Sequence, residues 1–93
     1  MYELVTTRHF MRSAKKFLRK HPDLRGRFAM LIDGLRDDPF QPHLKLHSPG
    51  GKLEGIFAVS ITHSYRLTLT LKITEKEIIL LDIGSHDDVY RKG

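Results

Sequence analysis

The amino-acid sequence predicts an α+β fold, in which a two-helix antiparallel hairpin packs on a small, twisted, mainly antiparallel sheet. Three observations predict it. Apolar residues recur at helical spacing in the N-terminal part, a segment rich in proline and glycine follows at 39–51, and apolar and polar residues then alternate along the chain. The expected order is β-α-α-β-β-β. A chain of 93 residues builds one core, so residues 1–93 are expected to form a single domain.

The N-terminal part is predicted to form a short strand and two helices. Residues 2–5 suit the strand, and Thr6 or Thr7 can cap the helix that follows. The apolar stripes of the two helices are formed by Phe10, Ala14, Phe17 and Leu18, and by Leu24, Phe28, Leu31, Ile32 and Leu35. Pro22 suits the first position of the second helix, and the sequence DDP at 37–39 ends it. The short connection predicts that the two helices lie antiparallel.

The C-terminal part is predicted to form three strands joined by tight turns. The strands span 53–61, 65–73 and 77–83, and the turns span 62–64 and 74–77. Alternation in the second of these strands predicts one buried and one polar face. The third strand is apolar on both faces except at Asp82, which predicts a central position in the sheet.

Composition narrows the classes of protein and of site. The chain has no cysteine, which excludes disulfides and thiolate metal sites and fits a reducing compartment. Its N-terminus lacks the apolar segment of a signal peptide, and no apolar run approaches the ~20 residues that a membrane span needs. A cytoplasmic protein without membrane contact is therefore expected. The histidines of HLKLH at 43–47 have no carboxylate or thiol pair at ligand spacing, so no metal site or other cofactor is expected.

The net charge of +5 is unevenly distributed along the chain. The segment from Arg8 to Arg36 contains nine basic and two acidic residues, which is a net charge of +7. Such a segment indicates a polyanionic partner, either nucleic acid or an acidic protein, unless it is only the solvated surface of two helices.

Polar side chains gather around the end of the last predicted strand. Strand alternation directs Arg66 away from the helices, where its guanidinium either reaches solvent or clamps a phosphate. His86 follows the strand end, where it is either a surface residue or a group that transfers protons. Tyr90 can fold back over the sheet and either pack on the core or stack on a base. His47 and His63 are nearby imidazoles.

These residue types can together cleave RNA without a metal ion. The 2′-OH of a ribose attacks the adjacent phosphate. The catalyst removes the proton of that hydroxyl, stabilises charge on the phosphoryl oxygens and protonates the leaving 5′-oxygen. One or two histidines, an arginine and a tyrosine suffice for these tasks.

Three segments of the chain carry a family resemblance: LKLHSPGGKLEGIFAVSI at 44–61, YRLTLTLKI at 65–73 and LLDIGSHDDVYR at 80–91. They resemble the RelE/ParE superfamily of type II toxin–antitoxin toxins, and most closely its YafQ-like and RelE/StbE plasmid stabilization branch. The resemblance covers nearly the whole chain and implies a RelE/ParE-like fold. Members of the RelE and YafQ type cleave mRNA in the ribosomal A site and use no metal. The resemblance therefore implies an mRNA interferase, which is a metal-independent endoribonuclease.

The resemblance also implies roles for individual residues. His86 resembles a catalytic histidine after the final strand, and Arg66 resembles an arginine that stabilises the transition state. Tyr90 resembles the C-terminal aromatic residue that stacks on the substrate or transfers protons, and His47 resembles the histidine before the L-x-G segment. Either His47 or His86 is expected to be the general base, with the other histidine or Tyr90 as the acid. The expected substrate-binding residues are Lys45, Lys52, His63 and Arg91, of which His63 is also a reserve candidate for the base.

Some positions depart from the family pattern. Ser60 and Ser64 stand where YafQ-like toxins have a further catalytic histidine and an aspartate. Phe57 and Val59 stand where RelE has two lysines. Asp87 is expected to cap the turn after the last strand or to orient an imidazole.

The resemblance implies three partners, namely a cognate antitoxin, mRNA and the ribosome. The +7 segment and the apolar sheet edges are the expected docking surfaces for the antitoxin. Two alternatives remain: a ParE-like toxin that inhibits gyrase by binding, and a non-catalytic member of the fold that binds antitoxin or nucleic acid. The histidines favour cleavage, because a pure binder has no need of acid–base groups.

Overall fold

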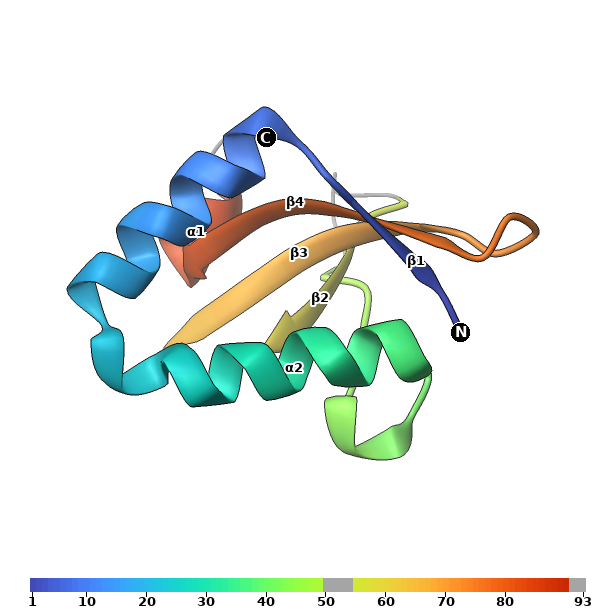
Figure 1. Cartoon of the computed structure of the whole chain (residues 1–93), viewed down its shortest axis with the longest axis horizontal. Helices are drawn as coiled ribbons and strands as arrows, with labels where there is room; N and C mark the ends of the chain where they lie inside the picture. The colour runs from blue at the N-terminus through green and yellow to red at the C-terminus, as the bar shows by residue number, and fades with distance from the viewer. Residues whose placement is uncertain (50–54, 91–93) are drawn as a thin grey trace.

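The chain folds into one sheet with helices packed on it (Figure 1). The structure is a computed structural model that describes residues 1–49 and 55–90, apart from the side chain of Tyr90. In chain order its elements are β1 (Glu3–Thr6), α1 (Arg8–Lys20), the 3₁₀ turn η1 (Pro22–Leu24), α2 (Arg25–Asp37), the 3₁₀ turn η2 (Pro42–Leu44), β2 (Phe57–Ser60), β3 (Tyr65–Lys72), β4 (Glu77–Ser85) and α3 (His86–Tyr90). The predicted β-α-α-β-β-β order is confirmed, and α3 is added at its end.

Within the described residues, four strands form a mixed sheet in the order β1-β4-β3-β2. β1 pairs with β4 in parallel, whereas β4 with β3 and β3 with β2 pair antiparallel. The predictions of a mainly antiparallel sheet and of a central last strand are therefore confirmed. The pairing of β1 with β4 reaches Leu80, and beyond it α1 lies beside the last part of β4, where His9 contacts Asp82.

One face of the sheet carries the hydrophobic core. The buried residues of this core are Phe10, Ala14, Phe17, Leu31, Leu35, Leu44, Val59, Ile61, Leu67, Leu69, Ile78, Leu80 and Ile83. The helical members all belong to the predicted apolar stripes, which is why both helices form where the periodicity places them. α1 and α2 spread apart from η1, and α1 packs against β4 (Figure 1). In the described ranges, no helix is both long enough and apolar enough to span a bilayer.

Two boundaries in the N-terminal part follow from local hydrogen bonds. Thr7 is the cap of α1, because its Oγ1 accepts a hydrogen bond of 3.0 Å from the backbone N–H of Phe10. Pro22 does not begin α2 as predicted. It begins η1, in which the N–H of Leu24 bonds to the carbonyl oxygen of His21 at 3.0 Å, the i to i+3 spacing of a 3₁₀ turn. α2 starts directly after this turn.

The ends of two strands also differ from the prediction. β2 is shorter than the predicted strand 53–61, since it begins only at Phe57. Gly55 precedes it with a φ of 81°, a left-handed conformation that does not continue a strand, and residues 50–54 lie outside the described part. β4 continues to Ser85, past the predicted end at Ile83, and leads directly into α3.

Candidate functional site

Arg66 lies at the end of the sheet where β3 begins and β4 ends. Its partners across the strands are Ser60 of β2 and Gly84 of β4. The next residue, Leu67, is buried in the core, so alternation places Arg66 on the face of the sheet opposite the core, as predicted. We call this the open face. There Nη1 of Arg66 donates a hydrogen bond of 2.9 Å to Oγ of Ser60. A guanidinium has five N–H groups, so donors remain for an anion.

α3 starts directly at the end of β4 and was not predicted. Ser85 and Asp88 cap it reciprocally. Oδ2 of Asp88 accepts a hydrogen bond of 3.2 Å from the backbone N–H of Ser85, and Oγ of Ser85 accepts one of 3.2 Å from the N–H of Asp88. This arrangement is a capping box, and its sequence signature is present as SHDD at 85–88. A search for that signature would have found α3 in the sequence.

The two aspartates of α3 have different roles. The predicted capping role of Asp87 is wrong, because Asp88 makes the cap. Asp87 is exposed instead, with Oδ1 3.9 Å from Nδ1 of His86. The pKa of Asp88 is lowered from its ordinary value of 3.8, mainly by hydrogen bonds from the backbone and side chain of Ser85. The positive charges of two lysines on α1 lower it further, although desolvation opposes them.

α3 approaches β4 closely at Gly84. A Cβ atom at this position would lie 2.9 Å from Cβ of Asp88 and 3.0 Å from its Oδ2. The backbone φ of Gly84 is 159°, at the limit of what other residues adopt. Because Gly84 also pairs with Arg66, this close packing holds the first turn of α3, which begins with His86, beside the strand that carries Arg66.

His47 extends the open face beyond the edge of β2. It forms an isolated antiparallel bridge with Ala58, which in turn pairs with Thr68 of β3. Residues directly opposite one another on paired strands share a face of the sheet, so His47 lies on the same face as Thr68. Thr68 is two residues from Arg66 along β3, and residues two apart on a strand share a face, so this is the open face. Nδ1 of His47 lies 3.0 Å from the carbonyl oxygen of Lys45. A carbonyl oxygen only accepts, so Nδ1 is the donor in this contact, and in the neutral ring Nε2 is the acceptor.

The structure describes the positions of the remaining predicted site residues less completely. His63 is exposed in the turn between β2 and β3, at the same end of the sheet as Arg66. Lys45 is exposed after η2 in a left-handed conformation, with a φ of 51°. Tyr90 is the last residue of α3, and its side chain lies outside the described part. Lys52 and Arg91 also lie outside the described residues.

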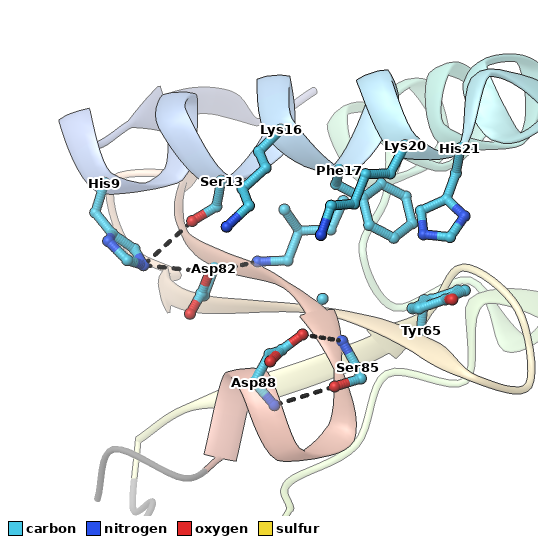
Figure 2. A pocket seen from close by; sticks show the side chains of 12 residues that line it. His9, Ser13, Lys16, Phe17, Lys20, His21, Tyr65, Asp82, Ser85 and Asp88 are labelled. Carbon is cyan, nitrogen blue, oxygen red and sulfur yellow. Dashed lines mark hydrogen bonds and ion pairs between the residues drawn. The ribbon is translucent and has the colours of Figure 1, made fainter.

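A pocket of about 580 Å³ lies between α1 and the end of β4 (Figure 2). We call it the α1 pocket. The residues that matter most here are His9, Lys16, Lys20, His21, Tyr65 and Asp88. Sequence reasoning gave no role to the pocket or to the histidines at 9 and 21. Its helical residues recur every three to four positions next to the apolar stripe of α1, a polar periodicity that the sequence contains.

Asp82 faces this pocket from the central strand. The pairing of β3 with β4 shifts there, because Thr68 is opposite Asp82 whereas the next residue, Leu69, is opposite Leu80. β4 thus has one more residue than β3 at this point, which is a β-bulge, and a bulge changes the direction of side chains. Oδ1 of Asp82 lies 3.2 Å from Nε2 of His9 on α1. The polar residue of the predicted apolar strand therefore has a specific partner.

Comparison with protein-family models gives no match, and neither does comparison with curated protein sequences. Solved structures match over nearly the whole chain. A copper-bound mutant toxin from Helicobacter pylori is 26% identical, with a TM-score of 0.78 over 97% of this chain and 100% of that one. YafQ from E. coli strain BL21(DE3) is 15% identical, with a TM-score of 0.79 over 97% of this chain and 99% of that one. A YoeB/ParE toxin from Agrobacterium tumefaciens is 18% identical, with a TM-score of 0.76 over 90% of this chain and 98% of that one.

This chain has the RelE/ParE-like toxin fold. The predicted resemblance is thereby confirmed at the level of the fold, with helices on a four-stranded mixed sheet. Other structures of this toxin fold contain partners or ions: YafQ has been solved in a DinJ-YafQ complex, and the Helicobacter pylori toxin with copper. Among the described residues of this chain, there is no group of three His, Asp or Glu side chains that could hold a metal ion.

Proposed function

We propose that this chain is the toxin of a type II toxin–antitoxin system and that it cleaves mRNA in the ribosomal A site without a metal ion. One observation carries the proposal. Arg66 pairs with Gly84, two residues before His86, so an arginine and a histidine stand at the same end of the sheet. The likeness of the whole chain to solved toxin structures supports the toxin function. The two side chains support the chemistry.

In the proposed reaction, the 2′-oxygen of a ribose attacks the adjacent phosphorus. The bond from this phosphorus to the 5′-oxygen of the next nucleotide breaks, and a 2′,3′-cyclic phosphate remains. A general base takes the proton of the 2′-OH, and a general acid gives a proton to the leaving 5′-oxygen. Arg66 donates hydrogen bonds to the phosphoryl oxygens, on which negative charge develops.

The hydrogen bond of His47 favours this residue as the base. Its Nδ1–H donates to the carbonyl oxygen of Lys45, so Nε2 has the lone pair that accepts a proton. His86 or Tyr90, both on α3, then supplies the proton for the leaving group. Lys45, Lys52, His63 and Arg91 are proposed to bind the RNA strand.

Cleavage of a reporter mRNA in a purified translation system, mapped by primer extension, tests the proposal. His86→Ala should lower the cleavage rate by ~10²–10⁴-fold, the usual contribution of one acid–base group. His43→Ala is the matched control, because His43 is exposed on η2 and has no proposed role. Cleavage at the wild-type rate by His86→Ala would contradict the site.

A ParE-like gyrase inhibitor is the second candidate, since a YoeB/ParE toxin shares the fold with a TM-score of 0.76. Such a toxin acts by binding and leaves mRNA intact. A gyrase supercoiling assay run in parallel with the translation assay separates the two functions. Inhibition of supercoiling without cleavage favours the gyrase inhibitor. Growth without arrest on induction, with antitoxin binding retained, identifies a non-catalytic member of the fold.

This chain has a groove of about 770 Å³ between β1, α1 and α2, which is a suitable docking site for the proposed antitoxin. Its apolar lining includes Leu4, Phe10, Leu18, Phe28 and Ile32, and its basic residues are Arg8, Arg12, Lys15 and Arg36. An apolar groove with basic residues around it complements an amphipathic helix with acidic flanks. The solved complex of YafQ with DinJ supports a protein partner for this fold.

Two exposed methionines provide a matched test of this groove. Met11 lines the groove and is 56% exposed, whereas Met30 is 75% exposed and lies outside it. Met11→Glu should weaken antitoxin binding about tenfold or more, because it places a charge against an apolar helix face. Met30→Glu should bind like the wild type. Equal weakening by both variants, or by neither, would exclude the groove as the docking surface.

A further inference from the structure

The α1 pocket has two carboxylates that already have partners within the protein. Oδ1 of Asp82 lies 3.2 Å from Nε2 of His9 and accepts a hydrogen bond of 2.8 Å from the backbone N–H of Ile83. Asp88 accepts the capping hydrogen bond of Ser85. Each carboxylate is therefore compensated without a ligand.

The two lysines of the pocket are not compensated in the same way. Lys16 and Lys20 lie one helical turn apart on α1 and point into the space above Asp88 (Figure 2). Throughout residues 1–49 and 55–89, neither ammonium group has a carboxylate within ion-pair distance. Their charges act on Asp88 only at longer range, where they lower its pKa. Two adjacent uncompensated cations favour an anionic ligand, and a phosphate most of all.

Next to the lysines the pocket has an aromatic wall. The rings of His21 and Tyr65 are 4.7 Å apart, and both lie about 5 Å from the buried ring of Phe17, at 4.7 Å and 5.1 Å respectively. In the described part of the chain, the hydroxyl of Tyr65 and the ring nitrogens of His21 have no hydrogen-bond partner. The planes of His21 and Tyr65 are inclined at 51°, so each ring presents its own half-buried face and polar edge. Such a face and edge suit a planar heterocycle that also forms hydrogen bonds.

We propose that the α1 pocket binds a phosphorylated nucleoside, with its phosphate at Lys16 and Lys20 and its base against Tyr65 and His21. The volume of about 580 Å³ lies within the usual range for small-ligand sites. The cleavage reaction proposed above uses Arg66, His47 and either His86 or Tyr90, and none of these four side chains. The pocket is therefore a second site.

The ligand is either a free mononucleotide or one nucleotide of an RNA strand. Ser85 lines the pocket and directly precedes His86, so the pocket adjoins the proposed cleavage site. In the RNA case, which rests on the proposed function, the pocket holds a nucleotide that flanks the phosphate being cleaved. The chemistry that recognises the ligand is the same in both cases.

The ligand test is an NMR titration of the whole chain with 5′-AMP, adenosine and inorganic phosphate at constant ionic strength. 5′-AMP should bind about tenfold more tightly than either adenosine or phosphate alone, because only AMP meets both the lysines and the aromatic wall. The ring signals of Tyr65 and His21 should shift with AMP. Equal affinity for AMP and inorganic phosphate, or no shift of these ring signals, would overturn the proposal.

The variant test removes the two lysines together. Lys16→Ala with Lys20→Ala should lower the affinity for AMP about tenfold or more, because the phosphate loses both charged contacts. The matched control is Arg19→Ala with Arg25→Ala, which removes the same charge from exposed positions outside the pocket. An equal loss in the control would mean that AMP binding reports only the net charge, and the pocket would be excluded.

A trinucleotide RNA distinguishes the two sources of the ligand. Binding about tenfold tighter than AMP, and weakened by the lysine double variant, identifies an RNA subsite; binding no tighter than AMP identifies a mononucleotide site. His86→Ala should retain AMP binding even though it is expected to lose cleavage. In the wild type, failure of cleavage with intact AMP binding refutes the proposed function alone, and intact cleavage without AMP binding refutes only the pocket.

Discussion

Ser85 and Asp88 each accept a hydrogen bond from the backbone N–H of the other, and this pair attaches α3 to the end of β4. The helix has only five residues, so it depends on its cap and its packing and not on helix propensity. His86, the residue on which the cleavage proposal rests most, is its first residue.

Removal of the Ser85 hydroxyl should weaken α3. Ser85→Ala loses the acceptor for the N–H of Asp88 and should lower the free energy of unfolding by ~1 kcal/mol, the usual effect of losing an N-cap. Thermal denaturation measures this change, and amide exchange should show faster exchange in α3. Ser64→Ala is the control, because Ser64 lies in an exposed turn. Unchanged exchange in α3 of the Ser85 variant would show that the cap does not hold the helix.

Acid should weaken the attachment of α3 to β4, because it protonates the carboxylate of Asp88. Its pKa is lowered below 3.8 in the folded chain, so the charged carboxylate stabilises the fold at pH values above 3.8. This stabilisation is lost as the pH falls through the lowered pKa. The difference in stability between the wild type and Asp88→Asn should therefore be constant near neutral pH and shrink below 3.8. Chemical denaturation at several pH values measures it, and a difference that grows on acidification would contradict the hydrogen bonding.

A methyl group at Gly84 should displace α3. In Gly84→Ala the new Cβ would lie 2.9 Å from Cβ of Asp88, which forces the helix or the strand to shift. The expected loss of stability is ~1–3 kcal/mol, as for other overpacked sites, together with loss of mRNA cleavage. Gly26→Ala is the matched control, because nothing lies within 4 Å of its new Cβ on α2. That variant should gain ~0.4–1 kcal/mol. Equal stability of the two variants would refute the close packing of α3.

The planar shape of the Arg66 guanidinium should contribute more to the rate of mRNA cleavage than its charge does. Arg66→Lys keeps the positive charge but loses the planar fork, in which one N–H group holds Ser60 while others reach two phosphoryl oxygens side by side. The cleavage rate should fall by ~10²–10³-fold, as when one donor to a developing anion is removed. Arg25→Lys makes the same exchange at an exposed position and should cleave normally. Wild-type cleavage by Arg66→Lys would mean that the site needs only a cation.

The order of helices and strands was predictable because hydrophobic periodicity is a local property of the chain. Phe10, Ala14 and Phe17 are buried at the spacing that predicted them, and Arg66 lies opposite the core because Leu67 is in it. α3 was also encoded locally, in the capping signature at 85–88. A turn capped by Asp87 was expected there, and no helix.

The sequence by itself determined the fold class, the two helical stripes and the face of the sheet on which Arg66 lies. Only the tertiary structure decided which polar groups meet. The parallel pairing of β1 with β4 lays α1 along the end of β4, and a bulge then turns Asp82 toward His9. The α1 pocket arises from this arrangement. Strand register and bulges depend on contacts between distant segments, and a local pattern of residue types does not specify such contacts.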